Sequence, residues 1–226
     1  MTCKGKGKED KMKLNKRIAS ILRISACVTG IMCVAGVTGC VAPFYGTARI
    51  EPGFHVNAGV GVGQFVGGSY EATSRYIGPR ADVEVGYAFS HFFKAHIRAG
   101  VGRGWRSEEY VEGESPPRSE ATLLDGAIGI QVSSPNHYPT PALRLEVGLA
   151  GVSTDLMFGI GKPEWLTLGT RVYFFKGELA QFYLPVAPFI GIHPLPHLSI
   201  FASPGTFAFY EDYKPLFSVG VGYKLK

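Results

Sequence analysis

The chain has 226 residues, and its 23 Lys and Arg against 18 Asp and Glu give a formal net charge of +5. Eight of the basic residues and two of the acids precede Cys40, so 15 basic and 16 acidic side chains remain from residue 40 onward. The positive charge therefore belongs to the first part of the chain, and we expect no nucleic-acid partner. All four cysteines lie within residues 1–40, so their even number does not indicate a disulfide framework.

The N-terminal part has the layout of a signal peptide. Residues 4–17 are basic and polar, and residues 24–37 form an uncharged apolar run. A positive region, a short apolar region and then small residues are typical of an exported protein. The run is short for a membrane-spanning helix, which needs about 20 apolar residues. Met12 begins a second basic stretch and is an alternative start of translation.

The apolar run ends in Val37-Thr38-Gly39-Cys40, which resembles the lipobox of bacterial lipoproteins. This resemblance implies that residues 1–39 are removed and that Cys40 becomes the lipid-bearing first residue. Val41 after the cysteine resembles the pattern that sorts lipoproteins to the outer membrane. An acylated cysteine that carries more than one chain gives stable anchoring. The alternative is an ordinary signal peptide, or an anchor helix, with an incidental cysteine.

From about residue 52 the apolar residues recur with period two, which is typical of β-strands whose two faces meet different environments. In the last segment Val219, Val221 and Tyr223 alternate with Gly220 and Gly222. Gly and Pro recur throughout and would interrupt helices. We predict strands near residues 53–66, 76–89, 92–105, 121–133, 141–151, 155–162, 165–176, 181–193, 197–207 and 214–225.

Either a soluble β-sandwich or a membrane β-barrel produces such alternation. Glycine is concentrated on the non-apolar face, which suits a narrow lumen, and aromatic residues gather near segment ends, as in the interfacial girdles of barrels. We therefore predict an all-β, up-and-down antiparallel transmembrane β-barrel of about ten strands. Because the segment at residues 155–162 is weak, a barrel of eight strands is the alternative. A lipid-anchored soluble β-domain is the alternative.

Residues 85–90 (Val-Gly-Tyr-Ala-Phe-Ser) followed by residues 93–96 (Phe-Lys-Ala-His) read as a strand, a turn and a strand. Here the chain resembles small outer-membrane β-barrel proteins of the OmpA-like or OmpW-like kind, which implies the outer membrane of a diderm bacterium and carries over no functional residue. We expect a signal peptide at 1–39, a lipidated linker at 40–52 and the barrel at 53–226. An even number of strands puts both barrel ends on one side, so we expect the lipid anchor on the periplasmic side.

Charged residues occupy many of the positions that would face the lumen. Because buried charges must be paired, we interpret them as a network of salt bridges that fills a narrow interior. A polar conduit or a catalytic cluster is the alternative. The proposed network comprises Asp82, Glu84, Lys94, His96, Arg98, Asp125, Arg144, Glu146 and Arg171.

The sequence offers no catalytic motif, metal site or cofactor site. His193 and His197 have the spacing of zinc-binding helices, but Pro194 and Pro196 prevent that helix. We expect membrane lipid as a partner, and an envelope or surface partner at loop 106–120. The preferred function is a structural or surface-interaction barrel. A soluble domain that binds a small apolar ligand or an envelope partner is second, and a barrel enzyme that acts on lipid is third.

Overall fold

The computed structural model describes residues 39–40, 42–69, 72–106, 120–149, 151–174, 186–205 and 216–225. The predicted signal peptide, apart from Gly39, lies outside these residues, as does nearly all of loop 106–120. No helix in the described ranges is long and apolar enough to cross a membrane.

The described part of the chain is built from strands. Ten of them correspond in order to the ten predicted segments, and the two-residue β1 was not predicted. The weak segment at 155–162 does form a strand, so the eight-strand alternative is wrong. The strands are β1 (Gly39–Cys40), β2 (Gly53–Ser69), β3 (Ala72–Ala88), β4 (Phe93–Arg106), β5 (Glu120–Ser133), β6 (Thr140–Gly148), β7 (Gly151–Ile160), β8 (Leu166–Phe174), β9 (Val186–Leu195), β10 (Leu198–Ser203) and β11 (Ser218–Leu225).

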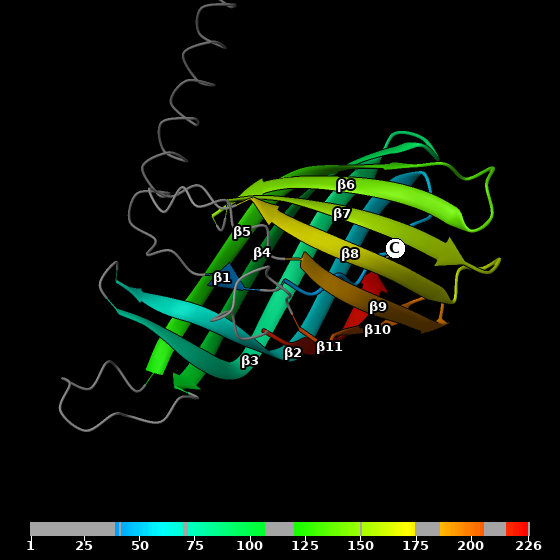
Figure 1. The fold of residues 1–226 in the computed structure, drawn as a ribbon. Helices are drawn as coiled ribbons and strands as arrows, with labels where there is room; N and C mark the ends of the chain where they lie inside the picture. The colour runs from blue at the N-terminus through cyan, green and yellow to red at the C-terminus, as the bar shows by residue number, and fades with distance from the viewer. Residues whose placement is uncertain are drawn as a thin grey trace, which may run out of the picture. The chain divides into compact units, whose positions relative to one another are not determined.

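Strands β2 to β11 form one closed antiparallel barrel (Figure 1). Each strand pairs with its neighbours in sequence, and β2 closes the ring by pairing with β11 as well as with β3. Closure leaves no free sheet edge along the paired wall. The predicted up-and-down barrel of about ten strands is confirmed, and a two-sheet sandwich is excluded.

The two faces of the wall differ in the way that the alternation predicted. Along β4, buried residues alternate with exposed ones, so that charged Lys94 and Arg98 point inward while Ile97 points outward with 63% of its surface exposed. Large apolar side chains such as Val60 and Ile128 are similarly exposed, at 63% and 62%. The barrel therefore has an apolar outside and a polar inside, the reverse of a water-soluble protein.

The barrel has two distinct ends. At one end, which we call the turn end, β3 joins β4 through residues 89–92 and β9 joins β10 through residues 196–197. At the other, the loop end, residues 107–119 and 175–185 connect β4 to β5 and β8 to β9. Figure 1 shows β2 to β5 reaching past the other strands at the loop end. Strand β2 continues to Ser69, although its pairing with β11 stops at Gly63.

The segment before β2 lies inside the barrel. Residues 42–50, which we call the luminal segment, include Phe44, Tyr45 and Ala48, all buried in one cluster with side chains of the barrel's inner wall. From the sequence, residues 40–52 are predicted only as a lipidated linker. The alternation of strand residues cannot reveal such a segment, because it has no periodic pattern of its own.

Candidate functional site: the barrel lumen

The inner wall carries a continuous network of buried ion pairs. All nine residues of the predicted network lie on this wall, each with less than a tenth of its surface exposed. The structure adds two members that the sequence analysis did not name, Arg80 and Asp155. Five acids then face five Lys and Arg among the described residues, with His96 beside them, so the network is close to neutral.

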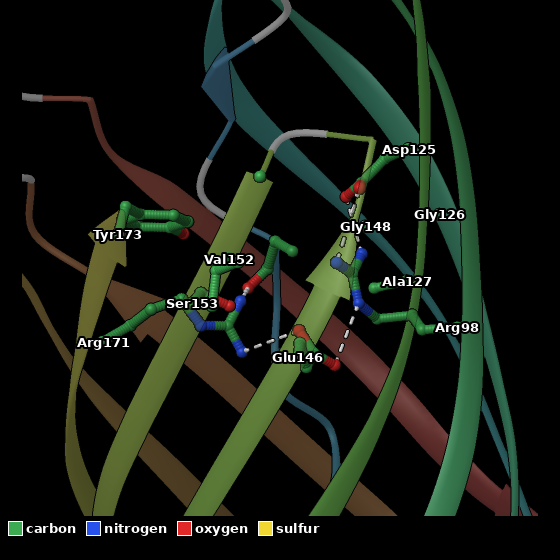
Figure 2. Close-up of a pocket in the computed structure, with 12 residues that line it drawn as sticks. Arg98, Asp125, Gly126, Ala127, Glu146, Gly148, Val152, Ser153, Arg171 and Tyr173 are labelled. Atoms are coloured by element: carbon green, nitrogen blue, oxygen red, sulfur yellow. Dashed lines mark hydrogen bonds and ion pairs between the residues drawn. The ribbon is translucent and has the colours of Figure 1, made fainter. Parts of the chain in front are cut away.

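Arg98 of β4 lies at the centre of one part of the network (Figure 2). Its Nη1 lies 2.6 Å from Oδ2 of Asp125 on β5, and its Nε lies 3.5 Å from Oε1 of Glu146 on β6. Arg80 of β3 reaches the same Asp125 at 3.2 Å and also pairs with Asp82. The cavity lined by Arg98, Asp125 and Glu146 is only about 20 Å³, which is space for about one water molecule.

Arg144 and Arg171 extend the network across β6, β7 and β8. Arg144 Nη2 lies 2.6 Å from Glu84 Oε2, and Arg144 also pairs with Glu146. Arg171 holds Asp155 with two bonds, of 2.5 Å from Nε and 2.6 Å from Nη2. Such forked pairs between a guanidinium and a carboxylate are strong and fix both side chains in place.

The two missed members follow the same alternation as their neighbours. Arg80 lies on the same side of β3 as Asp82 and Glu84, but the predicted network includes inward residues of this strand only from Asp82 onward. Asp155 shares its inward parity with Met157 on β7, and it stood at the first residue of the predicted strand. Both residues lie within the predicted strands 76–89 and 155–162, so the alternation itself places them on the inward side.

The luminal segment fits between the charged wall and an apolar part of the lumen. The Arg144 guanidinium lies over the Phe44 ring, 5.0 Å from its centroid, and the Phe189 ring lies 5.8 Å away on another side. Tyr45 packs against Phe201 with an edge-on geometry at 6.5 Å. Inward apolar residues on an otherwise polar face were a sign, in the sequence, that the lumen holds an apolar partner.

Inward glycines of β2 and β11 make the room that Tyr45 occupies. A Cβ added at Gly59 would lie 2.5 Å from Tyr45 Cζ, and one added at Gly222 would lie 2.6 Å from Tyr45 Cβ. Both distances are shorter than the closest approach of carbon atoms that are not bonded to each other. The glycine-rich inner face was interpreted as the lining of a narrow lumen, and the structure shows which side chain fills the space.

A chain of polar groups holds the luminal segment near the turn end. Ser199 Oγ donates to the carbonyl oxygen of Tyr45 at 2.9 Å. The Glu164 carboxylate accepts from the backbone N–H groups of Ala48 and Arg49, at 2.9 and 2.8 Å. These bonds satisfy backbone groups that would otherwise be buried without partners, which is costly.

The same chain places a hydroxyl beside an imidazole. Ser199 Oγ lies 2.9 Å from His193 Nδ1, His193 Nε2 lies 2.8 Å from Thr167 Oγ1, and Thr167 donates to Glu164 at 2.6 Å. A nucleophile, a base and an acid in series are the elements of covalent catalysis. Here, however, both ends of the series are engaged by the luminal segment, so its role is to hold that segment. The turn residues Ser90 and His91 do not pair with each other: Ser90 Oγ accepts from Phe92 N, and His91 Nδ1 lies 3.2 Å from Ile50 O.

A vestibule of about 160 Å³ lies between the luminal segment and the turn end. Basic and acidic side chains both line it, among them Arg49, Lys94, Lys224 and Glu51. Lys94 pairs with Glu84 at 2.6 Å and Lys224 with Glu51 at 3.1 Å. The vestibule is therefore large enough for several waters but is mostly balanced in charge.

Glu84, His96 and Glu146 bring three potential metal ligands within 4.8 Å of one another, all buried. The carboxylates already accept hydrogen bonds from Lys94 and Arg144. A divalent cation at this position would stand beside these positive charges and would have to displace them. The cluster is therefore part of the ion-pair network, in which Lys94 and Arg144 already supply the positive charge.

No family model matches the sequence, and no curated protein matches it. Among solved structures, the chain is similar to the Neisserial surface protein A (NspA), with 14% identity over 76% of this chain and 96% of that chain, and a TM-score of 0.32. It is also similar to Ail, the attachment invasion locus protein of Yersinia pestis, solved with the heparin analogue sucrose octasulfate. That match has 15% identity over 76% of this chain and 99% of that chain, with a TM-score of 0.29. The class of the protein, a closed ten-stranded β-barrel, rests on its own strand pairing.

Proposed function

We propose that the protein is an outer-membrane β-barrel lipoprotein with a structural or surface-interaction role, a closed lumen and no enzymatic activity. The observation that carries this proposal is the inverted distribution of side chains: apolar residues cover the outside of the barrel and paired charges fill the inside. A hydrocarbon environment stabilises such a distribution, whereas water does not.

The exposed aromatic residues support a membrane position. Trp105 lies on β4 toward the loop end and is 49% exposed, whereas Trp165, next to β8 at the turn end, is 53% exposed. Tyr87 and Phe92 add to the exposed aromatics at the turn end. Aromatic residues at both ends of an apolar band are typical of the two membrane interfaces.

The contents of the lumen support a closed barrel rather than a channel. The ion-pair network and the luminal segment both occupy the interior, and the cavity beside Arg98 has room for about one water. Equal numbers of acids and bases also give no preference for either sign of ion. A barrel of ten strands has a narrow interior, which side chains and one extended segment are sufficient to fill.

The same observations disfavour the two alternatives. A soluble domain that binds an apolar ligand requires an apolar cavity, but the vestibule beneath the luminal segment also carries charged side chains such as Lys94 and Glu51. An enzyme acting on lipid requires a nucleophile and base that a substrate reaches, whereas Ser199 and His193 are buried and engaged with other groups. The surface-interaction role is assigned to the loop end, where the connection between Arg106 and Glu120 carries most of its charge as acids.

The barrel is tested by electrophoresis of the membrane-fraction protein in SDS, boiled and unboiled. We expect the unboiled sample to migrate faster and to give a β-rich circular dichroism spectrum, because a closed barrel resists the detergent. Identical mobilities, together with release of the Cys40→Ala variant into buffer, would instead indicate a tethered soluble domain.

Lipidation is tested separately by mass spectrometry of the mature N-terminus. We expect the mass of a diacylglyceryl and an acyl group on Cys40, and we expect the Cys40→Ala variant to lack it. An unmodified Cys40 in a protein that still shows heat-modifiable migration would remove the lipid anchor and keep the barrel.

A further inference from the structure

The short strand β1 fixes where the luminal segment enters the barrel. Gly39 pairs with Val66 and Cys40 pairs with Phe65, near the end of β2 that leads into β3. Phe65 is in register with Tyr76, which pairs with Arg106. Cys40 is thus placed at the loop end, in the part of the wall where β2 extends beyond its pairing with β11.

The start of β2 lies at the opposite end. Gly53 pairs with Ala88, the last residue of β3, directly before the turn that leads to β4. Between Cys40 and Gly53 the chain must therefore run the length of the lumen, from the loop end to the turn end.

The contacts of the luminal segment follow this path in order. Near the loop end, Arg171 Nη1 donates to the carbonyl oxygen of Ala42 at 2.8 Å. Farther along, toward the turn end, Gln131 Nε2 donates to the carbonyl oxygen of Thr47 at 2.9 Å. At the turn end, His91 Nδ1 lies 3.2 Å from the carbonyl oxygen of Ile50.

We infer that the chain is threaded through its own barrel, so that Cys40 emerges on the side of the loops and its acyl chains enter the outer leaflet of the membrane. This inference rests on the proposed function, in which the barrel spans the outer membrane and Cys40 is lipidated. The number of strands alone had predicted a periplasmic anchor, because it places the start of β2 beside the end of β11. The luminal segment reverses that prediction by carrying the chain across the membrane once more.

The lengths of the connections show which end of the barrel faces the outside of the cell. Small barrels place their short turns in the periplasm and their longer loops outside. The four connections at the turn end have six residues or fewer. At the loop end, connections 70–71 and 149–150 are short, but 107–119, 175–185 and 204–217 each exceed ten residues. The partner of the N-terminal end is accordingly the lipid of the outer leaflet, and the anchor and the loops share one surface.

Three tagged versions of the full chain test the threading. One carries a short epitope directly after Cys40, one carries it between Arg106 and Glu120, and one carries it in the turn between Asn136 and His137. Antibody is applied to intact cells and to cells with a permeabilised outer membrane. We expect the tags after Cys40 and before Glu120 to be detected on intact cells, and the tag at 136–137 only after permeabilisation.

The other outcomes separate the inference from the proposed function. If the tag after Cys40 behaves like the tag at 136–137 while the tag before Glu120 is detected on intact cells, the threading is wrong and the barrel stands. If only the tag at 136–137 is detected on intact cells, the turn end faces outward, and surface presentation of Cys40 is wrong. If the protein leaves the membrane fraction, the proposed function itself fails.

A disulfide tests the luminal path without antibody. Tyr45→Cys and Gly59→Cys place two cysteines side by side, since a Cβ at position 59 lies 2.7 Å from Tyr45 Cδ2, one bond beyond the position that a thiol at residue 45 takes. The folded, heat-modifiable double variant is treated with an oxidant, denatured and compared by electrophoresis. We expect its mobility to change, a reductant to reverse the change, and neither single variant to show it. A folded double variant that forms no crosslink would overturn the luminal path.

Discussion

Replacing Arg171 with methionine tests how much the buried ion-pair network stabilises the barrel. Arg171 and Asp155 are 2% and 1% exposed and are joined by two hydrogen bonds. Methionine keeps much of the length of the side chain, but it leaves the Asp155 carboxylate buried without its main partner. Arg171→Met also removes the hydrogen bond to the carbonyl oxygen of Ala42.

Removing one member of a buried pair costs about 3–5 kcal/mol, because the other charge stays desolvated. Arg144 Nε remains 3.8 Å from Asp155 and compensates in part, so we expect a loss of about 3 kcal/mol, at the lower end of that range. The measurement is urea-induced unfolding of the protein in lipid vesicles. With a slope of about 1–3 kcal/mol per molar urea, the midpoint should fall by about 1 M or more.

The matched control is Arg103→Met. Arg103 pairs with Glu120 at the loop end, level with the interfacial Trp105 rather than with the apolar band, and these side chains are 66% and 43% exposed. An exposed pair contributes about 0–1 kcal/mol, so this variant should unfold close to the natural protein. The reasoning is refuted if Arg171→Met destabilises the barrel no more than Arg103→Met does.

Three further variants probe the packing of the lumen and the outer face. Gly59→Ala places a methyl group against the Tyr45 ring, so we expect the luminal segment to be displaced and the conductance in planar bilayers to rise. Tyr45→Ala in the same chain removes that ring and should restore stability; unchanged conductance and stability would contradict the packing. Ile128→Arg should lower stability in vesicles by about 2–4 kcal/mol, because it puts a charge against lipid, and no loss would mean that this face meets water. Glu164→Gln weakens a charged acceptor of the Ala48 N–H, so we expect a loss of about 1–2 kcal/mol in the same unfolding assay, and a variant equal to the natural protein would argue against this anchor.

The wall of the barrel could be predicted from the sequence because alternation is a local property. Each strand shows its two faces in consecutive residues, as in Ile97 and Arg98, and neighbouring strands connect in sequence order. Closure into a ring then follows from the need to pair every strand edge. Even the weak segment around Asp155 forms its strand, because its neighbours on both sides supply hydrogen-bonding partners.

The interior could be predicted only in part. The parity of each strand identified the nine charged residues that the structure brings together, but which acid meets which base depends on the stagger between strands. The luminal segment was missed for a different reason. Phe44 and Tyr45 belong to a short irregular stretch, and their burial depends on glycines such as Gly59 and Gly222 that lie far away in the sequence.

The most direct test of the account is quenching of tryptophan fluorescence by brominated lipids in reconstituted vesicles. The chain has two tryptophans, Trp105 and Trp165, and both lie exposed on the barrel, toward opposite ends. For a barrel that spans the bilayer, both should be quenched, and more strongly by bromine near the head groups than by bromine at the ends of the acyl chains. Single Trp105→Phe and Trp165→Phe variants assign each signal to one interface. Fluorescence that is insensitive to bromine at every depth would show that the apolar outer face does not meet lipid, and would contradict the membrane barrel.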